Sequence, residues 1–173
     1  IADKFPELKV TYVNNPKYES TNYIYSIWLA KSLMDDDILL IHGDMVFDKK
    51  LLGKFLKHPY PTAVLVNNKI KAPEKDFKVR IVDGIVKEIG ANLFGKDAFF
   101  LAPVYKFSKD NFNVCLSEIN RFIKNGNVTL YAEDAFNKAF DQIKLIPVYC
   151  GDEFCMEIDN YDDLEIARNF YKP

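Results

Sequence analysis

The sequence predicts an α/β domain with three layers and a mixed central sheet. Short apolar runs typical of strands alternate along the chain with stretches of helical periodicity. An Asp-Gly pair between two apolar runs predicts a hairpin that interrupts this alternation. Strands that alternate with helices form a sheet covered on both faces, and the hairpin adds antiparallel strands to it. The 173 residues match one domain and are enough to bury a sizeable core.

Periodicity and turn residues place the elements along the chain. Strands are predicted at residues 9–13, 38–42, 62–66, 79–82, 85–89, 99–107, 144–149 and 153–158. Helices are predicted at residues 22–33, 49–56 and 161–171, after the cap at residues 108–110 as far as about residue 124, and, as a short helix, within residues 129–140. The first helix is expected to bury Ile24, Ile27, Trp28 and Leu33.

Each boundary has a local chemical reason. Ser20, Thr21 and Asn22 are N-cap candidates for the first helix, and Ser108-Lys109-Asp110 is expected to cap the third. The third helix ends at residues 125–127, where a glycine lies between two asparagines. The apolar run Ile38-Leu39-Leu40-Ile41 predicts a strand that is buried on both faces.

Two acids stand where predicted strands end. Asp44 follows the run at residues 38–42 through Gly43, which is expected to let the backbone turn tightly, and Asp159 follows the last strand. Ligands of open α/β sheets bind at such strand ends, and Mg²⁺ is usually held by one or two carboxylates together with substrate phosphates. The pair therefore predicts a magnesium site for phosphoryl or nucleotidyl transfer. Judged singly, Asp44 is equally well explained as a turn residue and Asp159 as a helix N-cap.

Two further segments contain candidate binding residues. The loop at residues 15–26 leads into a helix N-terminus, whose free N–H groups suit a base or a phosphate, although Thr21 and Asn22 equally fit plain capping. Tyr131 beside Glu133 can form part of a box for an ammonium group, although both also fit the start of an amphipathic helix. His42 lies beside Asp44, and as a lone histidine it is interpreted as structural.

Composition excludes several classes of protein. A net charge of −2 gives no basic footprint for nucleic acid, and no apolar stretch approaches the about 20 residues of a membrane span. The three cysteines have no metal-ligand spacing and indicate reduced thiols in the cytoplasm, with a Cys150–Cys155 disulfide as the disfavoured alternative. The many aromatic residues are compatible with a homodimer.

Three motifs in order resemble the nucleotidyltransferases of the sugar-phosphate and choline-phosphate type. The first is Asn-Pro-x-Tyr-x-x-Thr-Asn-x-Ile-Tyr-Ser at residues 15–26. The second is Asp-Asp-Asp-x-Leu-Leu-Ile-x-Gly-Asp-x-Val-Phe-Asp at residues 35–48, and the third is Glu-Ile-Asp-x-x-x-Asp-Leu-Glu-x-Ala at residues 157–167. The resemblance is greatest to the choline-phosphate cytidylyltransferase-like branch, which includes aminoethylphosphonate cytidylyltransferases.

This resemblance implies a Rossmann-like nucleotidyltransferase fold in which Asp44 and Asp159 bind a catalytic Mg²⁺. The implied reaction moves a nucleotidyl group, CMP from CTP, to a phosphorylated small molecule such as choline phosphate and releases pyrophosphate. The implied nucleotide-binding residues are Thr21, Asn22, Ser26 and Gly43, and the residues implied to face the acceptor's ammonium group are Tyr131 and Glu133. The acceptor stays open among choline phosphate, aminoethylphosphonate and a sugar 1-phosphate.

One feature of that family has no match in residues 1–173. Its members begin with a strand and a Gly-rich loop that contains arginine, followed by a Pro-Lys pair, and these residues bind the triphosphate. Pro16-Lys17 of this chain is not that pair, because it follows a different strand. We therefore expect a single domain over residues 1–173 that is N-terminally truncated and inactive by itself. A nucleotide-sugar glycosyltransferase and a non-catalytic nucleotide-binding module are the alternatives.

Overall fold

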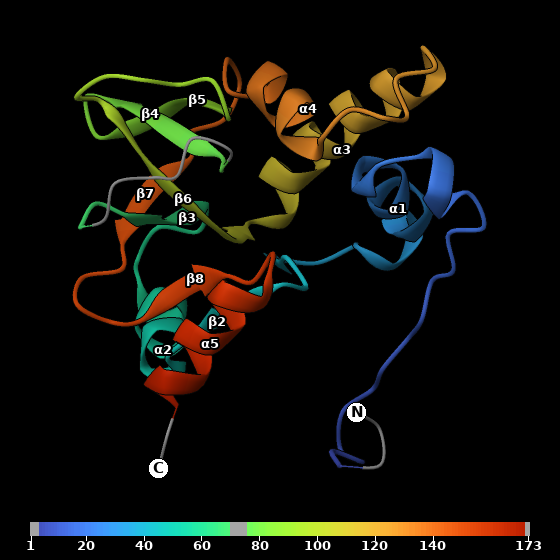
Figure 1. The fold of residues 1–173 in the computed structure, drawn as a ribbon. Coiled ribbons are helices and arrows are strands. Elements are labelled where there is room, and N and C mark those ends of the chain that lie inside the picture. The colour runs from blue at the N-terminus through green and yellow to red at the C-terminus, as the bar shows by residue number, and fades with distance from the viewer. Residues whose placement is uncertain (1–3, 70–75, 172–173) are drawn as a thin grey trace.

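The computed structural model describes residues 4–69 and 76–171 and shows a mixed sheet with helices on both of its faces (Figure 1). The strands are β1 (Ile38–Ile41), β2 (Met45–Phe47), β3 (Ala63–Asn67), β4 (Lys78–Val82), β5 (Ile85–Gly90), β6 (Ala98–Phe107), β7 (Ile146–Tyr149) and β8 (Cys155–Glu157). The α-helices are α1 (Tyr23–Ala30), α2 (Lys49–Lys57), α3 (Lys109–Lys124), α4 (Ala132–Ala139) and α5 (Tyr161–Phe170). Within the described residues, no helix has the length and apolar character that crossing a membrane requires.

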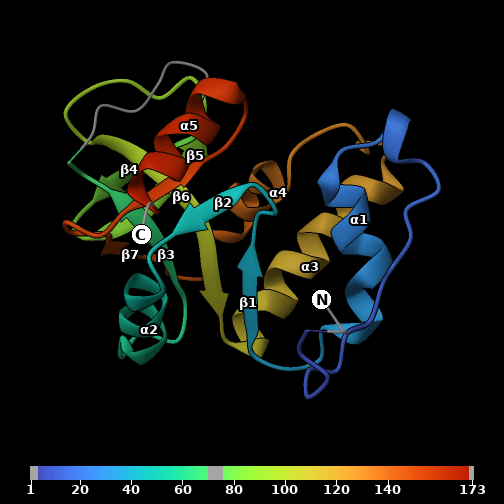
Figure 2. The ribbon, with the colours of Figure 1, turned by 60° about the horizontal axis from the view of Figure 1, so that its bottom comes forward.

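The long strand β6 organises the sheet. The strand order is β5-β4-β6-β3-β7, and β1 pairs with the end of β6 that β4 leaves uncovered. β3 and β7 are parallel, whereas the other pairs of this sheet are antiparallel, so the predicted mixed sheet is confirmed. β2 and β8 pair in a separate two-stranded ribbon. β2 follows β1 directly in the chain (Figure 2).

Two apolar clusters separate the three layers. Successive residues of a strand point to opposite faces, so Val64 and Val66 join the larger cluster, which α1, α3 and α4 cover, while Leu65 joins the smaller one. α2 closes the smaller cluster with Phe55, which is fully buried. In Figure 1 the helices α1, α3 and α4 accordingly lie apart from α2. All three cysteines are buried free thiols.

The local signals in the sequence have the expected structural effect. Asp83 and Gly84 adopt φ values of 51° and 73°, which is the left-handed conformation that a tight two-residue hairpin needs. The side chain of Ser108 accepts a hydrogen bond from the N–H of Asn111 and begins α3, and Gly126 follows the end of that helix with a φ of 80°.

Three sequence predictions are wrong. Residues 9–13 form no strand, because no described strand pairs with them, and Tyr12 is 78% exposed. β1 is covered on one face only: Ile38 and Leu40 pack against the larger cluster, whereas Leu39 and Ile41 are exposed. Leu33 is also exposed, because the helix tightens to a 3₁₀ turn at Lys31–Leu33 and its side chain leaves the buried stripe.

Candidate active site

A cleft of about 280 Å³ opens at the end of β1. The ends of β1 and β8, the start of α1 and the start of α4 all contribute side chains to it. Its lining combines acids with aromatic rings and includes Tyr23, His42, Asp44, Tyr131, Glu133, Glu157 and Asp159. Four of the eight candidate residues from the sequence therefore line this cleft, and they come from both halves of the chain: Asp44, Tyr131, Glu133 and Asp159.

The pairing of β2 with β8 brings the two predicted acids together. Met45 lies opposite Glu157 in the antiparallel ribbon, and the N–H of Ile158 donates to the carbonyl oxygen of Asp44 at 3.0 Å. Asp44 and Asp159 consequently line the same cleft, although 115 positions separate them in the chain. The antiparallel register fixes this proximity through backbone hydrogen bonds.

The N-cap explanation of Asp159 is wrong. Asn160 caps α5, since its side-chain oxygen accepts from the N–H groups of Asp162 and Asp163. The backbone N–H of Asp159 donates to the carboxylate of Asp163 at 3.0 Å. The carboxylate of Asp159 is thus not needed to begin the helix and lies on the cleft.

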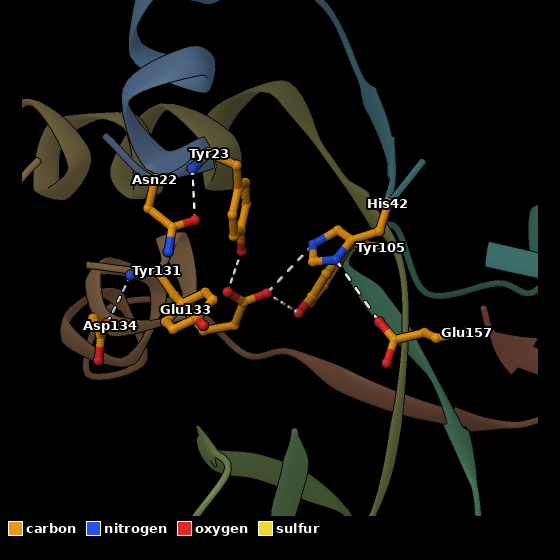
Figure 3. A network of polar contacts seen from close by, with 8 residues as sticks. All are labelled: Asn22, Tyr23, His42, Tyr105, Tyr131, Glu133, Asp134 and Glu157. Atoms are coloured by element: carbon orange, nitrogen blue, oxygen red, sulfur yellow. Dashed lines mark hydrogen bonds and ion pairs between the residues drawn. The ribbon is translucent and has the colours of Figure 1, made fainter. Parts of the chain in front are cut away.

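A buried carboxylate lies behind the cleft. Glu133 is 1% exposed and accepts hydrogen bonds from the hydroxyl groups of Tyr23 and Tyr105, the latter at 2.7 Å (Figure 3). Burial and the adjacent negative charge of Glu133 raise the pKa of both tyrosines. Because their pKa is raised, both hydroxyl groups keep their protons near neutral pH and donate to the carboxylate of Glu133, which holds it in one place.

His42 lies between two carboxylates. Its Nε2 is 3.7 Å from Oε1 of Glu133, and its Nδ1 is 4.0 Å from Oε1 of Glu157 (Figure 3). The ring of Tyr23 packs edge-on against the imidazole with centroids 4.9 Å apart. Nε2 is buried and has no hydrogen-bond partner within the described part of the chain. The interpretation of His42 as structural stays a prediction.

The cleft has a strongly negative electrostatic character. Burial, followed by repulsion from Asp44, Asp76, Asp159 and Glu133, raises the pKa of Glu157 to about 7. No lysine or arginine is among the described residues that line the cleft. Carboxylates gathered in this way suit a divalent cation, because oxygen ligands of this type bind hard cations.

Residues 15–26, which run from a loop into the start of α1, form one polar cluster. The amide of Asn15 donates to the side-chain oxygens of Thr21 at 3.0 Å and Ser26 at 3.1 Å. The side chain of Asn22 accepts from the N–H of Tyr23 and caps α1, so the capping interpretation of Asn22 is confirmed. The nucleotide-binding role of Thr21, Asn22 and Ser26 stays a prediction.

Gly43 differs from the expectation. Its φ is outside the left-handed range that favours glycine, so the turn after β1 does not require this residue. A Cβ at this position would meet no atom within 4 Å, which leaves the backbone open on that side. Its contact with nucleotide stays a prediction.

Glu157, Tyr23 and Asp76 line the cleft and were not singled out in the sequence. A signal for Glu157 did exist, because it lies two positions before Asp159 and alternate residues of an extended segment share a side. Tyr23 and Asp76 had no comparable signal, since each reaches the cleft only through tertiary packing.

Comparison with known structures identifies the fold. No protein-family model matches the chain. The inositol-1-phosphate CTP transferase of T. maritima superposes with a TM-score of 0.71 over 90% of this chain and 63% of its own length, at 22% identity. The CTP:phosphocholine cytidylyltransferase of Streptococcus pneumoniae gives a TM-score of 0.77 over 98% of this chain and 74% of its own, at 18% identity. This chain has the nucleotidyltransferase fold.

Two further similarities agree with this assignment. A putative glucose-1-phosphate thymidylyltransferase of Bacillus anthracis, solved with a sucrose, gives a TM-score of 0.73 at 16% identity over 98% of this chain and 68% of its own. The CMP-5'-(3-aminopropyl)phosphonate synthase of Streptomyces rubellomurinus (strain ATCC 31215) is 31% identical over 68 residues. That match covers 39% of this chain and 11% of the synthase. The Rossmann-like nucleotidyltransferase fold predicted from the three motifs is confirmed.

Proposed function

We propose that the protein is a nucleotidyltransferase that moves CMP from CTP to a small phosphorylated or phosphonylated acceptor. The observation that supports this most is the convergence of Asp44 and Asp159 on one acidic cleft of a nucleotidyltransferase fold. Two of the similar structures are named for CTP, and the partial relative is named for a CMP product. We expect the protein to act in the cytoplasm.

Asp44 and Asp159 are the proposed ligands of a Mg²⁺ ion. Their carboxylates suit the ion, which when bound would neutralise charge on the triphosphate. The protein's part is to hold the α-phosphate in line with the attacking oxygen of the acceptor, and pyrophosphate is the leaving group. The proposed base-side residues fix the nucleoside at the start of α1: Thr21 and Asn22 lie just before the helix and Ser26 lies within it.

The aromatic part of the cleft favours an acceptor with an ammonium group. The ring of Tyr131 lies 4.9 Å from Phe77 and 6.4 Å from Tyr23, so three rings line this part of the cleft. Aromatic faces and carboxylates both attract a cation. Because Glu133 is buried and Tyr131 is 46% exposed, Glu133 acts through its charge and Tyr131 through contact. Choline phosphate and aminoalkylphosphonates are therefore the first acceptors to test.

The test is release of pyrophosphate by the full-length protein with CTP, Mg²⁺ and each acceptor. Asp44→Asn and Asp159→Asn should each lower turnover at least about 100-fold without loss of folding. Asp152→Asn is the matched control, because the Asp152 side chain is 95% exposed and lies outside the cleft. Full activity in both variants would overturn the proposal. A nucleotide-sugar glycosyltransferase would release no pyrophosphate, and a binding module would bind CTP without turnover.

A further inference from the structure

We infer that His42, Asp44 and Glu157 form a binding site for a divalent transition-metal cation, with Nδ1 of His42 as a nitrogen ligand. The inference deepens the proposed function, because it shares Asp44 with the proposed magnesium pair. It goes further by adding His42 and Glu157 as ligands. It also names a class of cation that a site made of carboxylates alone would not favour. It rests on geometry that is independent of any nucleotide.

The three side chains are already close to one another. One ligand atom from each lies within 4.8 Å of the other two. Ligands on opposite sides of a cation with bonds of about 2.1 Å are about 4 Å apart, so small side-chain rotations complete the set. His42 and Asp44 flank the turn after β1, and Glu157 ends β8, so the β2–β8 ribbon holds all three.

The surroundings of His42 favour Nδ1, and not Nε2, as the nitrogen that binds the cation. A metal-bound imidazole usually donates its other N–H to a carboxylate, which fixes the ring and its tautomer. Glu133 Oε1 lies 3.7 Å from Nε2 of His42, close enough for a small ring rotation to make that hydrogen bond. With the proton on Nε2, the lone pair of Nδ1 points to the side where Glu157 lies at 4.0 Å.

Glu133 is held in place for this role. Tyr105, which is fully buried, and Tyr23 both donate to its carboxylate, and Tyr23 also packs edge-on against His42. The series Tyr105, Glu133, His42 therefore runs from the core to the cleft (Figure 3). Glu133 is a positioning residue here, since it acts on the cation only through the imidazole.

The ligand set determines the class of cation. An imidazole nitrogen suits first-row transition metals, whereas carboxylate and water suit Mg²⁺, Ca²⁺ and Mn²⁺; Mn²⁺, being a transition metal, accepts the nitrogen as well. The cysteines that would select a softer, thiolate-bound ion are buried elsewhere, with Cys150 and Cys155 in the cluster under α2. One nitrogen and two carboxylates therefore fit Mn²⁺, Co²⁺ or Zn²⁺ better than Mg²⁺.

The experiment measures Mn²⁺ binding to the full-length protein in the absence of nucleotide. Electron paramagnetic resonance gives the Kd, and electron spin echo modulation detects ¹⁴N bound to the ion. The chain has two histidines, so His42→Asn removes the proposed ligand and His58→Asn, at the end of α2, is the matched control. Nitrogen coupling should be present in the wild-type protein and in His58→Asn and absent in His42→Asn. The His42→Asn variant should also bind Mn²⁺ at least tenfold more weakly than the wild-type protein.

The outcomes separate this inference from the proposed function. Wild-type Mn²⁺ binding without nitrogen coupling, or coupling that persists in His42→Asn, would overturn the metal site while leaving Mg²⁺-dependent pyrophosphate release untouched. Glu133→Gln should weaken Mn²⁺ binding about tenfold and Mg²⁺ binding less than about threefold. Equal losses for the two ions would show that Glu133 is only structural, and circular dichroism checks that each variant is folded.

Discussion

The buried hydrogen bond between Tyr105 and Glu133 makes a sharp prediction about stability. Tyr105 is fully buried, and its hydroxyl donates to Glu133 at 2.7 Å. A hydrogen bond to a charged group contributes about 1.5–3 kcal/mol, and a buried polar group left without a partner costs about 1–3 kcal/mol. Tyr105→Phe should therefore lower the free energy of unfolding by about 2 kcal/mol.

The same substitution should behave differently when Glu133 is absent. Glu133→Ala leaves the hydroxyls of Tyr23 and Tyr105 without this acceptor and opens a small cavity, so it should cost about 4 kcal/mol. In that background Tyr105→Phe removes an unsatisfied hydroxyl and should be neutral or stabilising. The double-mutant cycle should then give a coupling energy of at least about 1 kcal/mol.

Urea unfolding followed by tryptophan fluorescence measures all four proteins. Trp28 in α1 is the only tryptophan of the chain and contacts the larger apolar cluster, so it reports on unfolding of this region. Tyr149→Phe is the matched control, because Tyr149 is 46% exposed, and it should change stability by less than about 0.5 kcal/mol. Equal costs of Tyr105→Phe with and without Glu133 would refute the hydrogen-bond argument.

Three other predictions follow from single features. Burial and neighbouring acids raise the pKa of Glu157 from 4.5 to about 7. Because the folded state holds this proton more tightly than the unfolded state, the metal-free protein should lose about 3 kcal/mol of stability as the pH rises from 4.5 to 7. Thermal melts of Glu157→Gln should not show this loss. Gly84→Ala should cost about 1 kcal/mol in urea unfolding, because φ is 73° there; no loss would contradict the hairpin geometry. Phe55→Ala should cost about 3–5 kcal/mol and the exposed Leu56→Ala less than about 0.5 kcal/mol, and similar values for the two would disprove the packing of α2.

The parts of the fold that depend on local chemistry could be predicted from the sequence. Asp83-Gly84 determines a hairpin through its own backbone conformations, and Ser108 begins α3 through its own side chain. The strand predicted at residues 9–13 failed because a strand needs a partner, and apolar alternation says nothing about whether that partner is present. The exposure of Leu39 and Ile41 on β1 likewise depends on what covers the sheet.

The candidate site could be predicted only in part. Asp44 and Asp159 stood out because each follows an apolar strand, and the structure brings both to one cleft. The place of His42 between Glu133 and Glu157 depends on β2–β8 pairing and on the packing of α4, and neither leaves a pattern in the sequence. The magnesium pair, the homodimer and the domain limits stay predictions.

The chemical fate of CTP tests the proposed transfer of CMP most directly. The full-length protein is incubated with CTP, Mg²⁺ and either choline phosphate or an aminoalkylphosphonate, and ³¹P NMR follows the products. If the protein transfers CMP, the CTP signals decrease while pyrophosphate and a new P–O–P linkage between CMP and the acceptor appear in equal amounts. Unchanged CTP with both of these acceptors and with a sugar 1-phosphate, or conversion to free CMP alone, would contradict it.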